Sequence, residues 1–417
     1  MRGPGIAGHF VDNHLPRGVD LNIIGGIDMR KVAVVGGGLS HWGIRKANWR
    51  ELVQEAGKAV LDDTQNLDKK DIDSLFVGAA SPDRWAFQCH VAPLVADMLG
   101  VYPNRMMART ELACASGQAA VRYAWLAIAS GFSEVALCLG VEKMNNPNML
   151  ESQTTMAAVL DREWDGIHGA SAPPFFAMCA QHHMKHYGTT RRQMSLVAEK
   201  NHRFSTTNPF AHFQKPVPAE KVEASPMVAP PLTLFDCSGI TDGAAAVILV
   251  SEERAKKMTD TPVWIKGSGQ CSGGNNSANW KSLDTWYPMQ VAAREAFRTS
   301  GITVDDIDLA EVHDCFTISE IIEYEDLGLC KKGEGGKFIE DGQSDIGGKV
   351  AVNTRGGLLG CGHPLGATGI GQIIEIYQQM QAKVPKARQV PDPQIGLTHN
   401  LSGAANVHSI LVFGRDA

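Results

Sequence analysis

Short apolar runs alternate with segments of helical periodicity along most of the chain. Residues 32–35, 74–77 and 134–140 form apolar runs of the length expected for buried strands. Between the last two, residues 114–131 place apolar positions at helical spacing. Such alternation is typical of α/β folds, in which helices cover a sheet.

The order of these elements recurs in the second half of the chain. The tripeptide Asp-Ile-Asp stands directly before the apolar run 74–77 and again before 309–312. A helix start rich in small residues follows each run, at 114–117 and at 360–371. Each copy then closes with strands, which we expect at 134–140, 395–398 and 407–413. The repeat predicts two similar halves, and a duplicated fold can place a site between its copies.

Residues 146–235 interrupt this rhythm. Within them, residues 151–235 carry eight Lys and Arg against seven Asp and Glu, a charge of +1. Since the whole chain has a net charge of −6, its other residues together carry −7. A Met-rich, less acidic insert suits a cover over a ligand with an anionic head and an apolar tail, although an ordinary insertion explains it equally well. We expect four parts: an extension at 1–28, an N-terminal half at 29–145 and 236–270, a loop domain at 146–235 and a C-terminal half at 271–417.

Composition narrows the function classes. The 417 residues are 44% hydrophobic and can bury a large core, and 39 Lys and Arg against 45 Asp and Glu argue against a binder of nucleic acid or of membrane surfaces. Residues 1–28 contain no apolar block and do not resemble a signal peptide. Nine scattered cysteines without a Cys-x-x-Cys pair indicate neither a zinc site nor a disulfide framework, and they fit a reducing cytoplasm.

The sequence Ala-Cys-Ala-Ser-Gly at 113–117 places Cys114 at the start of a predicted helix. The helix N-terminus and its unpaired backbone N–H groups favour a thiolate there, and the small neighbours leave room for a substrate. Taken alone, a cysteine at a helix start is more often a small buried residue.

Two further segments contain candidate chemistry. His313-Asp314-Cys315-Phe316 ends the predicted strand at 309–312, where open α/β sheets usually place their sites; the alternative is that His313 and Asp314 cap the following helix. The Gly-rich run at 360–369 surrounds His363 with residues that lack bulk, as a close approach of backbone to ligand requires.

Two weaker patterns favour structural explanations. The glycines at 36–38 are typical of a dinucleotide loop, but His41 stands where that motif needs glycine, so we expect a tight turn. His182 and His186 have the spacing of helical metal ligands, but no acidic or third ligand lies nearby in the sequence, which favours a solvated or ligand-facing helix.

In their order along the chain, these motifs resemble the thiolase superfamily over about residues 29–417. The segment Asp-Cys-Ser-Gly-Ile-Thr-Asp-Gly-Ala-Ala-Ala at 236–246 is similar to a fourth family motif. The His-Asp-Cys-Phe box, in place of the commoner Asn-Glu-Ala-Phe, resembles that of sterol-carrier-protein-type thiolases and archaeal acetoacetyl-CoA thiolases.

The resemblance implies a five-layered αβαβα core made of two similar halves, with an inserted loop domain. It implies homodimers or dimers of dimers, coenzyme A as a substrate, and neither a metal nor a tightly bound cofactor. Archaeal thiolases of this type work with a small protein that contains a zinc ribbon and an OB fold. This chain lacks zinc-ribbon cysteines, so such a module would be a separate polypeptide.

By motif position, the resemblance makes Cys114 the acyl-carrying nucleophile, His363 its base and His313 a side chain of the first oxyanion hole. It makes Ser238 a contact of the pantetheine arm. Many thiolases carry a second cysteine in a C-terminal Cys-x-Gly motif, which this chain lacks, so Cys315 would transfer the proton. The backbone N–H groups of Cys114 and Ser402 would form the second oxyanion hole.

The implied reaction is thiolysis of a 3-ketoacyl-CoA, or the reverse Claisen condensation, through an acyl-cysteine. Two alternatives remain: a decarboxylating condensing enzyme of the ketoacyl-synthase kind, and a catalytically silent scaffold or lipid-binding relative. An apolar wall for the acyl group is expected from Phe175, Phe176, Met178 and the stretch 149–156.

Overall fold

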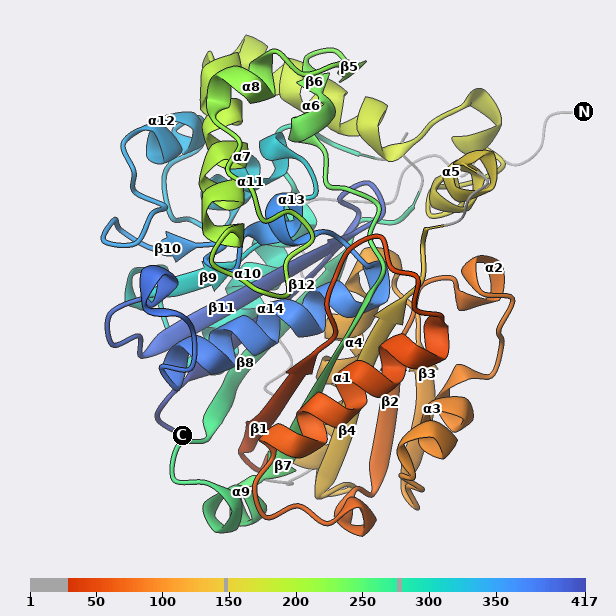
Figure 1. The fold of residues 1–417 in the computed structure, drawn as a ribbon. Helices are drawn as coiled ribbons and strands as arrows, with labels where there is room; N and C mark the ends of the chain where they lie inside the picture. The colour runs from red at the N-terminus through yellow and green to blue at the C-terminus, as the bar shows by residue number, and fades with distance from the viewer. Residues whose placement is uncertain (1–28, 146–148, 276–279) are drawn as a thin grey trace, which may run out of the picture.

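The computed structural model describes residues 29–145, 149–275 and 280–417 (Figure 1). The predicted extension at 1–28 lies outside the described residues. Within them, ten strands form one sheet in the order β10-β9-β11-β12-β8-β1-β7-β4-β2-β3. The strands of its first half are β1 (Val32–Leu39), β2 (Ser74–Gly78), β3 (Met106–Thr110), β4 (Val135–Glu142) and β7 (Gly243–Ser251). Those of its second half are β8 (Val263–Ser272), β9 (Leu309–Glu311), β10 (Ala351–Val352), β11 (Ile395–Ser402) and β12 (Val407–Gly414).

The two halves of the sheet repeat one strand arrangement. In the first half, β2 pairs in parallel with β3 and β4, and antiparallel pairing continues from β4 to β7 and from β7 to β1. In the second half, β9 pairs in parallel with β10 and β11, and antiparallel pairing continues to β12 and β8. The pairs Ala33–Trp264 and Val34–Val263 join β1 to β8. The predicted duplication is therefore confirmed.

The two halves of the sheet and the helices on their faces form five layers, with α4 (Ser116–Ala129) and α14 (Leu365–Met380) in the central one. The other helices that contact the sheet are α1 (Trp49–Asp63), α3 (Val91–Leu99), α9 (Glu252–Met258) and α10 (Tyr287–Ser300). Helix α14 packs on β4 and β7 of the first half and on β9 and β11 of the second, and α4 packs beside it. Helices α1 and α3 cover the first half, and α10 covers β8 and β12. The predicted αβαβα order is confirmed.

Small residues allow the two central helices to approach each other. A Cβ atom at Gly117 of α4, or at Gly140 of β4, would collide with the backbone carbonyl oxygen of Gly366 in α14. Positions 117 and 140 therefore need glycine, because α14 packs closely against α4 and β4. This packing brings the N-terminal ends of α4 and α14 together.

The insert between the halves is mainly helical. Its described part contains α5 (Met149–Ala157), α6 (Ala172–Tyr187), α7 (Arg191–Ser205), α8 (Ala219–Glu223) and the hairpin β5 (Met227–Ala229) and β6 (Leu232–Thr233). Helix α7 packs on the second half through α11 (Thr317–Asp326), α12 (Gly335–Glu340) and α13 (Gly357–Cys361). The domain boundaries stay a prediction. Among the described helices, we find none with the length and apolar character that crossing a bilayer requires.

Candidate active site

Cys114 lies in a tight turn between β3 and α4. Ala113 adopts a φ of 44°, in the left-handed region that residues with a Cβ atom seldom occupy. The hydroxyl of Ser116 holds the turn, because it accepts the N–H of Leu112 at 2.9 Å and donates to the carbonyl of Ala113 at 2.7 Å. The Cys-Ala-Ser spacing thus fixes the thiol at the N-terminal end of α4.

Burial raises the pKa of the Cys114 thiol to about 12, although the backbone N–H groups of Gly403 and of Cys114 itself act in the opposite direction. The backbone donors at this helix start therefore favour a thiolate, as expected, but burial outweighs them. The cost of burying the charge exceeds what these donors contribute. A nucleophile in this position needs a base.

His363 lies in the link between α13 and α14 and is oriented as such a base. Its Nδ1 is 2.7 Å from the hydroxyl of Thr368, and that hydroxyl donates its only hydrogen to the carbonyl of Pro364 at 2.9 Å. The hydroxyl therefore accepts from the ring, so Nδ1 carries the hydrogen and Nε2 has a free lone pair. Burial lowers the pKa of His363 to about 3, which keeps the ring neutral.

His313 has the opposite tautomer. Asn400 Nδ2 lies 2.9 Å from His313 Nδ1 and 2.7 Å from Gln372 Oε1. The side-chain nitrogen of Gln372 donates to two backbone carbonyls, which directs its oxygen at Asn400 and makes Asn400 present its NH₂ group to His313. His313 Nδ1 is therefore the acceptor and Nε2 carries the hydrogen. Burial, with three neighbouring histidines, lowers the pKa of His313 well below its usual value.

The two rings thus offer complementary atoms beside one thiol. Ligand atoms of Cys114, His313 and His363 lie within 4.8 Å of one another, and the two rings meet edge-on with centroids 4.9 Å apart. Neither Nε2 has a hydrogen-bond partner among the described residues, although both atoms are buried. Leaving such a group unpaired costs about 1–3 kcal/mol, so the fold holds an unused donor and an unused acceptor at the sulfur.

Cys315 lies beside the segment that contains Ser238. The N–H of Ser238 donates to the carbonyl of Cys315 at 2.9 Å. The buried Cys315 thiol is 3.7 Å from the hydroxyl of Ser319. Burial raises the pKa of Cys315 well above its usual value, and the nearby Cys114 adds to the rise. The thiol is therefore protonated at neutral pH, as a proton donor must be.

Asp314 has a structural position. Its carboxylate accepts the N–H groups of Leu358 and Leu359 at 2.7 and 3.1 Å, at the start of α13. The alternative that His313 and Asp314 cap the helix after Phe316 is wrong, because no side chain caps α11 and His313 faces the site.

Apolar side chains surround Cys114. It packs with Ala80, Trp85, Met144 and Leu365, and Met156 of the predicted wall packs against this cluster. The predicted wall residues Phe175, Phe176 and Met178 lie elsewhere. Phe175 and Phe176 belong to a separate cluster, where Phe176 stacks on Phe316 with ring centroids 4.5 Å apart, and Met178 is 49% exposed.

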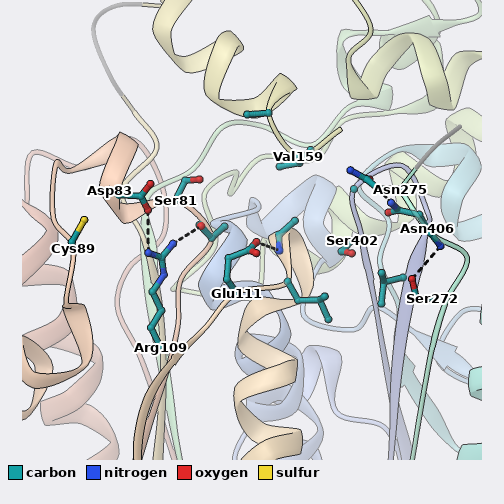
Figure 2. A pocket seen from close by; sticks show the side chains of 17 residues that line it. Ser81, Asp83, Cys89, Arg109, Glu111, Val159, Ser272, Asn275, Ser402 and Asn406 are labelled. Atoms are coloured by element: carbon teal, nitrogen blue, oxygen red, sulfur yellow. Dashed lines mark hydrogen bonds and ion pairs between the residues drawn. The ribbon is translucent and has the colours of Figure 1, made fainter. Parts of the chain in front are cut away.

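A cavity of about 810 Å³ opens next to the Cys114 turn (Figure 2). Its lining includes Leu112 and Ala113 of this turn together with Ser402 and Gly403. The predicted backbone donor segment is therefore next to the turn, but the N–H directed at the sulfur belongs to Gly403, one residue beyond Ser402. An ion pair between Arg109 and Asp83, at 3.0 Å, stands at the edge (Figure 2).

The glycines at 36–38 lie inside β1, so the tight turn expected there is wrong. A Cβ atom at Gly38 would collide with the backbone of α1. Gly38 is therefore small because α1 packs closely on the strand.

The sequence predicted Cys114, His313, Cys315 and His363 as catalytic residues. The structure brings Cys114, His313 and His363 together in one cluster. The sequence prediction missed Thr368, Asn400 and Gln372, which fix the two tautomers. Thr368 stands in the Gly-rich motif and Asn400 stands beside the missing Cys-x-Gly cysteine, but nothing in the sequence indicates that Gln372 reaches Asn400.

Protein-family models match nearly the whole described chain. Residues 32–253 match a model described as "Thiolase, N-terminal domain", and residues 246–415 match one described as "Thiolase C-terminal domain-like". The two matches correspond to the two halves of the sheet.

Individual relatives agree with the family models. Acetyl-CoA acetyltransferase of Methanothermobacter thermautotrophicus is 41% identical over 388 residues, which cover 93% of this chain and 100% of that protein. Benzoylsuccinyl-CoA thiolase subunit BbsB of Thauera aromatica is 34% identical over 382 residues, which cover 91% of this chain and 97% of that protein. Sterol carrier protein 2 of Bos taurus is 32% identical over 400 residues, which cover 92% of this chain and 72% of that protein. The solved structure of an Ltp2-ChsH2(DUF35) aldolase superposes with a TM-score of 0.79 at 25% identity, covering 93% of this chain and 98% of that one.

Proposed function

Because the chain belongs to the thiolase superfamily of coenzyme A-dependent acyltransferases, we propose that it cleaves a 3-ketoacyl-CoA with CoA through an acyl-Cys114 intermediate, or runs the reverse condensation. The observation that supports this most is that His313 and His363, which cluster with Cys114, each have an unpaired Nε2 atom. The acceptor on His363 suits removal of the thiol proton, and the donor on His313 suits an oxyanion.

In the first half of thiolysis, His363 Nε2 takes the proton of Cys114 and the thiolate attacks the 3-keto carbon. The bond between C2 and C3 then breaks, which leaves the acyl group on Cys114 and an enolate of acetyl-CoA. His313 Nε2–H stabilises the thioester oxygen of that enolate, and Cys315 protonates its C2 carbon.

In the second half, CoA resolves the acyl-enzyme. Its thiol gives a proton to the Cys315 thiolate and attacks the acyl carbon, while the backbone N–H groups of Cys114 and of the 402–403 segment face the developing oxyanion. Cys114 leaves as a thiolate and recovers its proton from His363. Ser238, placed against Cys315, would contact the pantetheine arm.

Asn400→Leu tests the tautomer assignment. Without the amide donor, His313 divides between its two tautomers, so carbon–carbon cleavage should slow by about twofold or more, far less than the about 10²-fold for full loss of an oxyanion donor. Acyl transfer from acyl-CoA to Cys114 should change little, because that step forms no enolate. Stopped-flow measurement of both half-reactions checks this, and an unchanged cleavage rate in a folded variant would contradict the assignment.

We propose acyl groups larger than acetoacetyl as the preferred substrates. The apolar side chains around Cys114 and the relative named for benzoylsuccinyl-CoA support this, whereas the acetyl-CoA acetyltransferases support a small substrate. Each buried CH₂ group contributes about 0.8 kcal/mol, or roughly fourfold in kcat/KM.

A thiolysis assay over acetoacetyl-, long-chain and aromatic 3-ketoacyl-CoA measures this preference. A bulky substrate should give the highest kcat/KM, and Met156→Ala should lower that value more than the value for acetoacetyl-CoA. If acetoacetyl-CoA is best and bulky substrates are not turned over, the site is small. Cleavage that needs no CoA would indicate an aldolase reaction instead.

A second polypeptide is proposed as a partner, namely a small protein with a zinc ribbon and an OB fold. One relative is named as a subunit, and the superposed aldolase is named for two components, Ltp2 and ChsH2(DUF35). Co-purification of the enzyme from its natural source should recover such a protein in a fixed ratio. Full activity of a homo-oligomer that contains no small subunit would count against this partner.

The chain itself is proposed to form a homodimer or a dimer of dimers. Strand β3 lies at one edge of the sheet, and its Met106 and Met107 are 37% and 39% exposed. Apolar side chains on an open strand edge favour pairing with a second chain. Sedimentation should show an oligomer for the wild type and a shift toward the monomer for Met106→Lys.

A reducing cytoplasm is the proposed compartment. All nine cysteines are free, and five of them are buried. Proteins from oxidising compartments usually pair such thiols.

A further inference from the structure

His182 and His186 lie one turn apart on α6, and both rings point at Asp284. The sequence places no acidic or third ligand near the two histidines, but the fold brings Asp284 from about a hundred residues away. Nδ1 of His182 is 2.7 Å and Nδ1 of His186 is 2.9 Å from the same carboxylate oxygen, Oδ2. Ligand atoms of the three residues lie within 4.8 Å of one another.

Asp284 is held in place before any ligand arrives. The residue is 3% exposed, and Ser282 donates to its other oxygen, Oδ1, at 2.7 Å, while Thr285 donates to the same oxygen at 3.2 Å. One carboxylate oxygen is thus oriented by hydroxyl groups, and the other is left to the imidazoles.

We propose that His182, His186 and Asp284 form a binding site for a divalent transition metal of the Zn²⁺ class. The ligand atoms would be the two Nδ1 atoms and Oδ2, and water would complete the tetrahedron. At bond lengths of about 2.0–2.1 Å, tetrahedral ligands lie roughly 3.3 Å apart, so each N–O separation must widen by about 0.5 Å. The His182 and His186 side chains are 35% and 46% exposed, which gives the rings room to move.

The donor set determines the class of metal. Imidazole nitrogens suit Zn²⁺, Co²⁺, Ni²⁺ and Cu²⁺, whereas Mg²⁺ and Ca²⁺ prefer sites made of oxygen atoms. Binding through Nδ1 moves each ring hydrogen to Nε2, where exposed rings can donate it to water. Two neutral rings and one carboxylate leave a bound dication with a charge of +1, which a partly exposed site tolerates.

The position of the cluster indicates a structural role. Helix α6 already contacts the segment 280–286 through Phe175 on Trp280, with centroids 4.4 Å apart, and through Phe176 on Trp286 at 6.2 Å. Phe176 also stacks on Phe316, the residue after Cys315. A metal would fasten the insert to the second half behind the proposed proton donor. The site shares no residue with the catalytic set, so it stands independently of the proposed reaction.

A Co²⁺ titration of the full chain tests the proposal. Cys114→Ala is the background, because Cys114, His313 and His363 form a second cluster that could take the metal. We expect one Co²⁺ per chain, with the visible spectrum of nitrogen and oxygen ligands and no sulfur charge-transfer band. His182→Gln and His186→Gln should each weaken binding by about tenfold or more. His168→Gln removes an exposed histidine of the same insert and should leave binding unchanged.

Unchanged Co²⁺ binding in the His182→Gln and His186→Gln proteins, or no saturable binding at all, would overturn the site. Thermal unfolding gives a second readout. Zn²⁺ should raise the Tm of the Cys114→Ala protein, a chelator should reverse the rise, and the added His186→Gln substitution should remove it. An equal rise with and without His186 would overturn the proposal as well.

Discussion

The Cys114→Ala protein should lose thiolysis by about 10⁴-fold or more while it remains folded, because no other group can carry the acyl chain. The thiol packs among Ala80, Trp85, Met144 and Leu365, so removing one sulfur atom leaves only a small space. Stability should therefore change far less than activity. Steady-state thiolysis and thermal unfolding of the same preparation measure the two effects.

Cys138→Ala is the matched control. Cys138 is fully buried in β4, its thiol donates to the carbonyl of Ala120 at 3.7 Å, and burial raises its pKa too. The two variants differ only in whether the thiol faces His313 and His363. Cys138→Ala should retain activity, so comparable losses in the two variants would point to folding rather than chemistry. Full activity in Cys114→Ala would remove Cys114 from the mechanism.

Cys315→Ala should separate the two half-reactions. Acyl transfer from acyl-CoA to Cys114 requires no protonation of carbon, so its rate should stay near that of the wild type. Carbon–carbon cleavage requires an acid at C2 of the enolate and should fall by about 10²-fold or more. Rapid-quench measurement of acyl-enzyme formation, beside steady-state cleavage, gives both rates.

Cys315→Ser is the informative companion, because a hydroxyl has nearly the size of the thiol but is a much weaker acid at this position. It should pack like the wild type and cleave slowly. If Cys315→Ala or Cys315→Ser reduces both half-reactions equally, Cys315 serves folding or binding and the proton comes from elsewhere.

The sequence was sufficient for the features that depend on local patterns. Strands are short and apolar here, so 74–77 and 309–312 could be located directly, and the Asp-Ile-Asp tripeptides before them indicated the duplication that the strand pairing confirms. Cys114 and His363 were identifiable because their motifs have small neighbours. Those neighbours are needed for the contact of α4 with α14, which places both side chains at one point.

The features that the sequence did not indicate depend on contacts between distant residues. Gln372 orients Asn400, and Asn400 lies 87 positions from His313, so the tautomer of His313 follows from three segments that only the fold brings together. The same holds for Asp284, which converts two helical histidines into a candidate metal site. The raised pKa of Cys114 could not be predicted, because the helix N-terminus is visible in the sequence, whereas the depth of burial is not.

Trapping the acyl-enzyme tests the central claim most directly. The protein is mixed with acetyl-CoA in the absence of an acceptor, quenched in acid, digested and analysed by mass spectrometry. One acetyl group should appear on the peptide that contains Cys114, disappear when free CoA is added before the quench, and be absent from the Cys114→Ala protein. An acetyl group on a different residue, or turnover at the wild-type rate with Cys114 unmodified, would contradict the account.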